Sequence, residues 1–317
     1  MQSQNGLNTS SIGWLAFELS VLRRLKFESV AFPLAGDANL AMYVKHFGAR
    51  VLANDPAQWA WTQALAFVEN NCDTLTEQDL ATILDDAYVP RNQLGDPGLL
   101  SWFNETDASW FDNVRVNADR LASSYKRALV LAIGMAVGDY VFSFNVDTRG
   151  LRRPLWLSHV FRLAWQTLPQ PINNLRKNTS SNQPVKNFLA DTQNTDLLFL
   201  RLPRPARAID SRNARALTWR EEWVRQGKVP SDDSPTQRGA KLDGYVETKE
   251  QYLRVIEELL TTSSHLPLWA IEGVSDGFLS TEELIECVEG ARKIDAIYTK
   301  DFSELLGIQS VIITASA

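Results

Sequence analysis

The chain has 317 residues, of which 44% are hydrophobic and 22% are charged, and its formal net charge at pH 7 is −6. This length accommodates one large α/β domain or a domain with a sizeable insertion. No apolar run approaches the roughly 18 residues that a membrane-spanning helix needs, which excludes a membrane partner. The acidic balance excludes wholesale coating of nucleic acid but allows a local basic surface. The first residues lack the basic and apolar blocks of a signal peptide, so we expect a cytoplasmic protein.

An apolar run that ends in a turn of small residues stands out in the first part of the chain. Residues 29–34 predict a strand, which leads into the turn Leu34–Ala35–Gly36–Asp37–Ala38. Residues 40–47 follow with helical spacing, and residues 50–53 predict a second strand that ends at Asn54–Asp55. This pattern is the opening β-α-β of a doubly wound fold.

The turn and the acid are the candidate ligand-binding residues of this unit. A turn of small residues lets a ligand approach the backbone, and an acid at the end of the second strand receives the hydroxyls of a ribose. We therefore expect Gly36, Asp37 and Asp55 to bind a nucleoside cofactor. The alternative is purely structural, with Gly36 making a turn and Asp55 capping the next helix.

The middle of the chain is mostly helical and rich in tryptophan. We predict a largely helical insertion at residues 72–180, between the two parts of the α/β domain at residues 1–71 and 181–317. Within it, Thr74-x-x-Glu77 predicts a helix cap, and residues 171–187 predict a polar loop. The simplest interpretation of the tryptophans is a large aromatic core, and the alternative is a base-stacking surface. Half of the ten tryptophans lie in the middle of the chain: Trp102, Trp110, Trp156, Trp165 and Trp219.

The last third of the chain alternates strands and helices. Residues 196–202 form a near-continuous apolar run, which is typical of a central parallel strand. Residues 266–272, 293–298 and 310–314 predict further strands, and the capping box at residues 280–283 predicts a helix among them. Together these elements predict an α/β fold with a doubly wound, mostly parallel sheet and a helical insertion.

With these elements placed, the chain resembles the Dam-type adenine-specific DNA methyltransferases, a family that uses S-adenosylmethionine and has a class I methyltransferase fold. The turn at residues 34–38 stands where that family has Phe-Ala-Gly-Ser-Gly, and Asn54–Asp55 matches its Asn-Asp. Residues 269–272 resemble its late strand. The similarity is loose over the whole chain and specific around residues 32–56. It implies S-adenosylmethionine as the cofactor, with Gly36, Asp37 and Asp55 as the residues that hold it.

The resemblance breaks at the catalytic motif, Asp-Pro-Pro-Tyr in the family. Here the strand is followed by Arg201–Leu202–Pro203–Arg204, so that Arg201 replaces the acid and Arg204 replaces the aromatic residue. In the family, the acid accepts hydrogen bonds from the amino group of the flipped base, on which the aromatic ring stacks. Arginine has five donors and no acceptor, so it cannot replace the acid. The sequence therefore predicts that adenine methyl transfer is lost.

Two other positions also depart from the family. Asn182–Gln183–Pro184 stands about where the family has Asn-x-Asp, whose acid meets the cofactor's adenine. Ala38 replaces the second glycine of the turn, which restricts the approach of a ligand to the backbone.

A basic segment directly follows the altered motif. Residues 201–225 carry seven arginines against three acids, a local balance of +4 in an acidic protein. Guanidinium groups suit phosphate contacts, and we predict Arg212, Arg215 and Arg220 as nucleic-acid contacts. The alternative is internal pairing with the glutamates of the same segment.

Three functions follow from these observations. The favoured one is a catalytically inactive, nucleic-acid-associated binding protein of methyltransferase descent, with DNA as the expected partner. The second is a working S-adenosylmethionine-dependent DNA adenine methyltransferase with a nonstandard motif. The third is a protein-interaction scaffold that uses the tryptophan-rich insertion.

Overall fold

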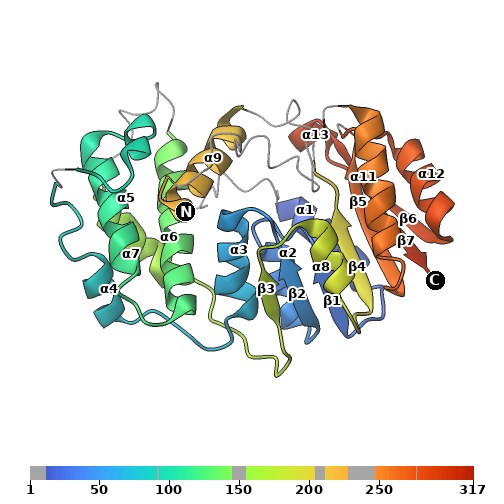
Figure 1. Cartoon of the computed structure of the whole chain (residues 1–317), viewed down its shortest axis with the longest axis horizontal. Coiled ribbons are helices and arrows are strands. Elements are labelled where there is room, and N and C mark those ends of the chain that lie inside the picture. Colours follow the sequence, from blue (N-terminus) through green and yellow to red (C-terminus); the bar gives the residue numbers. More distant parts are fainter. Residues whose placement is uncertain are drawn as a thin grey trace.

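A computed structural model of the chain shows one mixed sheet beside a helical unit (Figure 1). Within the described residues the sheet has seven strands in the order β3-β2-β1-β4-β5-β7-β6. The strands are β1 (Ser29–Phe32), β2 (Arg50–Asn54), β3 (Thr179–Ser181), β4 (Leu197–Arg201), β5 (Leu268–Val274), β6 (Ile294–Asp301) and β7 (Gln309–Ser316). The structure describes residues 12–90, 93–144, 155–203, 211–227, 246, 248–275 and 277–317.

The sheet is mostly parallel. The strands from β3 to β5 pair in parallel, whereas β7 is antiparallel to both β5 and β6. The α/β class and the mostly parallel sheet are confirmed, and the arrangement is compatible with a Rossmann-like fold. The loop predicted at residues 171–187 is wrong in part, because β3 lies within it. This three-residue edge strand, Thr-Ser-Ser, has no apolar residue that would reveal it.

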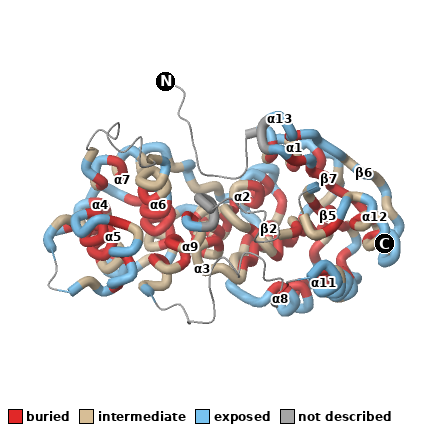
Figure 2. Tube along the Cα trace, turned by 90° about the horizontal axis from the view of Figure 1, so that it is seen from above, coloured by how far each residue is buried: buried red, intermediate tan, exposed pale blue. Residues whose placement is uncertain are grey.

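Successive residues of each central strand point to opposite faces of the sheet, as the pleat requires. Val30 and Phe32 of β1 belong to one buried cluster, and Ala31 between them belongs to another. The first cluster is covered by α1 (Ile12–Leu22) and α2 (Asn39–His46). The second is covered by α8 (Val185–Asp191), α11 (Lys249–Thr262) and α12 (Thr281–Ala291), and Figure 2 shows α8 and α11 opposite α1 and α2.

The helical unit has its own aromatic core, which includes buried Trp110, Trp219 and Trp223. These side chains are 0–1% exposed, so the interpretation of a large aromatic core is confirmed for them. Two of them lie on α9, which follows β4 in sequence but packs against α6 beside the insertion (Figure 1). The helices of the unit are α4 (Glu77–Ile83), α5 (Glu105–Ala118), α6 (Ser124–Phe142), α7 (Leu157–Gln166) and α9 (Ser211–Arg225).

Short elements complete the described part of the chain. They are α3 (Gln58–Ala64), the π-helical turn η1 (Leu65–Glu69), the 3-10 turn η2 (Pro97–Ser101) and α13 (Ser303–Leu306). The capping box predicted at Ser280 and Glu283 is confirmed. The box predicted at Thr74 is wrong, because α4 is capped by Thr76 with Asp79. In the part of the chain that the structure describes, no helix is both long and apolar enough to cross a bilayer.

Candidate ligand-binding site at the carboxyl ends of the strands

The turn after β1 lies at the carboxyl end of the sheet, where open α/β sheets bind their ligands. Gly36 and Ala38 both have a left-handed backbone, with φ of 58° and 59°. For alanine this conformation costs roughly 1–2 kcal/mol, and the side chain of Ala38 is buried. The turn is held to the end of β2 by a hydrogen bond of 2.9 Å from the Ala35 amide to the Asn54 carbonyl. Ala38 thus occupies a position whose backbone conformation favours glycine.

Asp55 follows β2 and fixes this turn. Its carboxylate accepts a hydrogen bond of 2.9 Å from the Gly36 amide and another of 2.9 Å from the Ala57 amide. Helix α3 begins at Gln58 with Ala57 as its cap, so the prediction that Asp55 caps that helix is wrong. The hydrogen bond from the Gly36 amide to the Asp55 carboxylate brings these two predicted cofactor residues together.

Asp55 is only 8% exposed. Burial raises the pKa of its carboxyl to about 7, although the two backbone hydrogen bonds act in the opposite direction; the neighbouring Glu221 adds a smaller increase. The group is therefore poised to change charge close to neutral pH. A ligand that needs the carboxylate form will bind more tightly above pH 7 than below it.

Asp37, the third predicted cofactor residue, is half-buried in the same turn. Its carboxylate accepts hydrogen bonds from the backbone and side-chain nitrogens of Asn39, at 3.2 and 2.9 Å. Asp37 thus braces the first residue of α2 and also contributes to the electrostatic environment of Arg201.

The loop after β3 reaches the same edge of the sheet. The Asn54 side chain accepts a hydrogen bond of 3.0 Å from the Gln183 amide and donates one of 3.1 Å to the Pro33 carbonyl. Asn182 donates a hydrogen bond of 2.7 Å to the backbone carbonyl of Asp55. Residues 182–184, which stand where the resembled family has Asn-x-Asp, therefore do lie beside the predicted cofactor residues.

Arg201 ends β4 and lies between two buried glutamates. Its Nε donates to a carboxylate oxygen of Glu18 on α1 and to one of Glu272 on β5, at 3.0 Å each. The two glutamates are 0% and 1% exposed, whereas 31% of the Arg201 side chain is exposed. We call these three residues the arginine–glutamate cluster. Sequence reasoning identified Arg201 but neither glutamate.

The charges of the cluster depend on one another. Burial lowers the pKa of Arg201, but the attraction of Glu18, Glu272 and Asp37 outweighs it and raises that pKa, so the guanidinium stays charged. Burial and the neighbouring Glu18 raise the pKa of Glu272 well above its usual range, against the opposing effect of Arg201. One arginine thus serves two buried carboxyl groups, and each of the two glutamates opposes ionisation of the other.

The cluster touches the turn after β1. A Cβ atom at Gly36 would lie 3.8 Å from Nη1 of Arg201, so the guanidinium lies over the turn that was predicted to hold the cofactor. After Arg201, Leu202 is buried, and the Pro203 carbonyl accepts a hydrogen bond of 3.0 Å from the Tyr252 hydroxyl. Arg204 lies outside the described residues.

The three arginines predicted to contact nucleic acid occupy different environments on α9. Arg220 is 5% exposed; its Nε donates to Asp139 at 3.1 Å, and its guanidinium lies 5.3 Å from the ring of Trp59. Arg215 is exposed, with its guanidinium 5.8 Å from the Trp102 ring. Arg212 belongs to the helix, but its side chain lies outside the described residues. Arg220 is thus paired inside the protein, but with Asp139 of α6 and not with the glutamates of its own segment.

Glu221 is a buried residue beside the site, whereas the sequence indicated it only as an ion-pair partner within its own segment. It reaches from α9 to the start of α3, where its carboxylate accepts hydrogen bonds from the amides of Gln58 and Trp59 at 3.2 and 3.0 Å. It also forms an ion pair with Arg225 one helical turn later. The spacing of Glu221 and Arg225 was the available signal, and it indicated pairing within the helix.

Of the residues that the structure describes, the two acids that pair with Arg201 at the end of β4 are Glu18 and Glu272, and both are buried. Among the described residues, no group of three His, Cys, Asp or Glu side chains is placed to hold a metal ion. No protein-family model matches this chain, and no curated protein is similar enough to match it.

Proposed function

We propose that this chain is a methyltransferase-like binding protein that does not carry out adenine methylation. The observation that carries the proposal is the arginine–glutamate cluster at the end of β4. The strand order, with antiparallel β7 between β5 and β6, supports the methyltransferase descent, because class I methyltransferases have this order. The Gly36–Asp55 contact after β1 and β2 supports it as well.

The cluster opposes the chemistry for a specific reason. Methylation of adenine needs an acceptor for the hydrogen bonds of the base's amino group, and a guanidinium only donates. Arg201 cannot simply swing aside, because it would leave two carboxylates buried without their cation. Neither glutamate is available as a substitute acid, since both are buried and paired with Arg201.

Binding of S-adenosylmethionine is a separate part of the proposal. The Asp55 oxygens already accept two backbone hydrogen bonds, but a carboxylate offers about four acceptor sites. Two sites thus remain for the hydroxyls of a ribose. We propose that Asp55 receives that ribose and that Gly36 lines the turn beside it.

Calorimetric titration with S-adenosylmethionine tests this binding. We expect Asp55→Ala to weaken binding by about 1.5–3 kcal/mol, the contribution of a charge-assisted hydrogen bond. The matched control is Asp85→Ala, because Asp85 is an exposed acid of the insertion that pairs only at the surface. Wild-type protein that gives neither heat nor a thermal shift at millimolar ligand would contradict the proposal.

The same titration has a pH signature. Since the pKa of Asp55 is about 7, its carboxylate fraction rises about tenfold between pH 6 and pH 8, and the affinity should rise with it. This dependence should disappear in Asp55→Ala, which separates it from ionisation of the ligand itself.

DNA is the partner that the resemblance favours, and exposed Arg215 supports it on α9. Duplex binding should weaken steeply with salt, because each phosphate neutralised contributes about −0.9 to the slope of log K against log salt. We expect Arg212→Ala with Arg215→Ala to weaken binding evenly across sequences and to flatten this slope. Arg254→Ala, at an exposed position of α11, is the control. An unchanged slope in the double variant would remove these arginines from the interface.

A further inference from the structure

A separate cavity of about 310 Å³ lies between α2, η1, α6 and the segment after α7. It is near the end of α2, which precedes the start of β2, so it is at the opposite end of the strands from Gly36 and Asp55. Its volume is at the lower end of the range for small-molecule sites. The ligand that fits it is therefore small.

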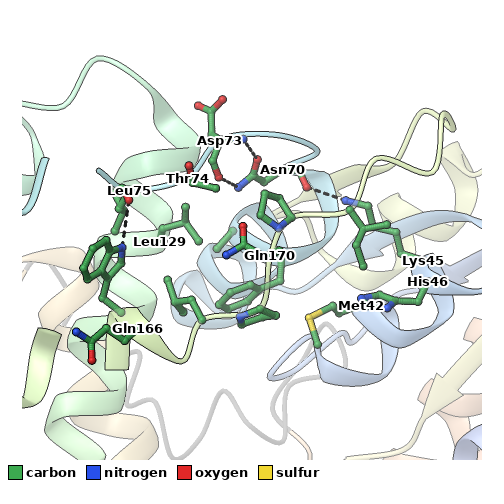
Figure 3. A pocket seen from close by; sticks show the side chains of 17 residues that line it. Met42, Lys45, His46, Asn70, Asp73, Thr74, Leu75, Leu129, Gln166 and Gln170 are labelled. Carbon is green, nitrogen blue, oxygen red and sulfur yellow. Dashed lines mark hydrogen bonds between the residues drawn. The ribbon is translucent and has the colours of Figure 1, made fainter. Parts of the chain in front are cut away.

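The walls of the cavity are apolar on one side and cationic on the other. Phe67, Leu129 and Leu168 are among the apolar lining residues, and Lys45 and His46 line it from α2. Figure 3 shows Lys45 and Leu129 on opposite sides, with Gln170 between them. The lining thus combines an apolar wall with one localised positive charge.

Lys45 is the unusual residue of this cavity, because its side chain is a cation that is only 1% exposed. Its Nζ donates a hydrogen bond of 2.7 Å to the Asn70 carbonyl. Within the described residues no carboxylate forms an ion pair with it, and burial lowers its pKa to about 8. An ammonium has three donors, so this contact leaves two of them without a partner among the described residues, and a ligand reaches them once the lining beside the buried side chain shifts.

The other titratable groups of the lining do not neutralise Lys45. His46 is exposed, and burial together with the charge of Lys45 lowers its pKa. Asp73 lies at the rim, where its carboxylate accepts a hydrogen bond from Ser123 and points away from Lys45 (Figure 3). A buried charge without a counter-ion is costly, and an anionic ligand would remove that cost.

We propose that this cavity binds a small carboxylate with an apolar body, whose carboxylate group pairs with Lys45 and whose body packs against Phe67, Leu129 and Leu168. The site is independent of the proposed binding of S-adenosylmethionine, since it shares no residue with Gly36, Asp37 or Asp55. The π-helical turn η1 forms part of its wall, and such turns are frequent at functional sites.

The test compares 4-phenylbutanoate with its neutral amide by calorimetric titration against the full chain. We expect the carboxylate to bind about tenfold or more tightly than the amide, the difference that a charge-assisted hydrogen bond supplies. Lys45→Met keeps the aliphatic stem and removes the charge, so it should abolish this preference. Leu168→Ala shortens the apolar wall, so it should weaken both probes by a similar factor.

Folding of each variant is checked by circular dichroism and thermal unfolding. Equal affinity for acid and amide, no binding of either at millimolar concentration, or an unchanged preference in Lys45→Met would each overturn the proposal. In the last two cases Lys45 would serve only to cap the carbonyl end of η1 through Asn70.

Discussion

Arg201 keeps two carboxylates inside the fold that would otherwise be buried without a cation. Glu18 comes from α1 and Glu272 from β5, so a single side chain connects the first helix to the centre of the sheet through β4. A buried ion pair of this kind adds little net stability to the fold. Removal of the arginine is nevertheless costly, because it leaves buried charge without a counter-ion.

Replacement of Arg201 by methionine should therefore destabilise the protein. We expect a loss of about 3 kcal/mol in the free energy of unfolding, the lower part of the range for breaking a buried ion pair, because Arg201 is itself partly exposed. Urea denaturation measures the change. Arg254→Met on the surface of α11 should stay within about 0.5 kcal/mol of wild type. A similarly small effect at Arg201 would show that Glu18 and Glu272 are neutral and do not need the arginine.

At the level of residues, sequence patterns identify positions better than partners. Gly36 and Asp55 were predicted as a pair because their places after two adjacent strands bring them to one edge. Glu18 and Glu272 were not predicted, since each lies in an apolar element and only the tertiary fold brings them to Arg201. Arg220 was predicted at a surface, but Asp139 on α6 holds it inside.

Two glycines on α6 allow α9 to pack closely against it. A Cβ atom at Gly138 would lie 2.0 Å from Trp219, and one at Gly134 would lie 2.0 Å from Trp223. These contacts explain how large rings of α9 enter the core of the helical unit. They also explain why a helix that follows β4 belongs to that core.

Gly138→Ala should destabilise the protein by about 1–3 kcal/mol through overpacking, although alanine is the better helix former. The control is Gly290→Ala on α12, where no described atom lies within 4 Å of the new methyl group. That change should be neutral or stabilising by up to about 1 kcal/mol. Thermal and urea unfolding of both variants check the pair. Equal effects at the two sites would argue against close contact between α6 and α9.

At the level of elements, predictions from the sequence depend on how strong the hydrophobic pattern is. The central strands β1, β2 and β4 were predicted close to their observed limits because each is an apolar run. β3 was missed because it is short, polar and at the sheet edge. The association of α9 with α6 could not be predicted. Glycines four residues apart on α6 indicate close packing against another element, but they do not show which element that is.

Over the whole molecule, α9 links the helical unit to the candidate site. Its tryptophans fill the core beside α6, while its Glu221 holds the start of α3 near Asp55. The buried tryptophans also leave little apolar surface for a protein-interaction scaffold. Among the described tryptophans, Trp156 is the exposed one, and 67% of it is exposed. The binding proposal therefore centres on the sheet edge rather than on the insertion.

The central claim is that the arginine–glutamate cluster stands where adenine methylation needs a hydrogen-bond acceptor, so that the protein does not methylate adenine. The most direct measurement incubates the protein with S-adenosylmethionine carrying a tritiated methyl group and with DNA of mixed sequence. We predict no tritium in the DNA above a heat-killed control, because Arg201 offers no acceptor to the base and remains paired with Glu18 and Glu272. Incorporation above that control, and lost in Asp55→Ala, would contradict the account and identify the protein as a working methyltransferase.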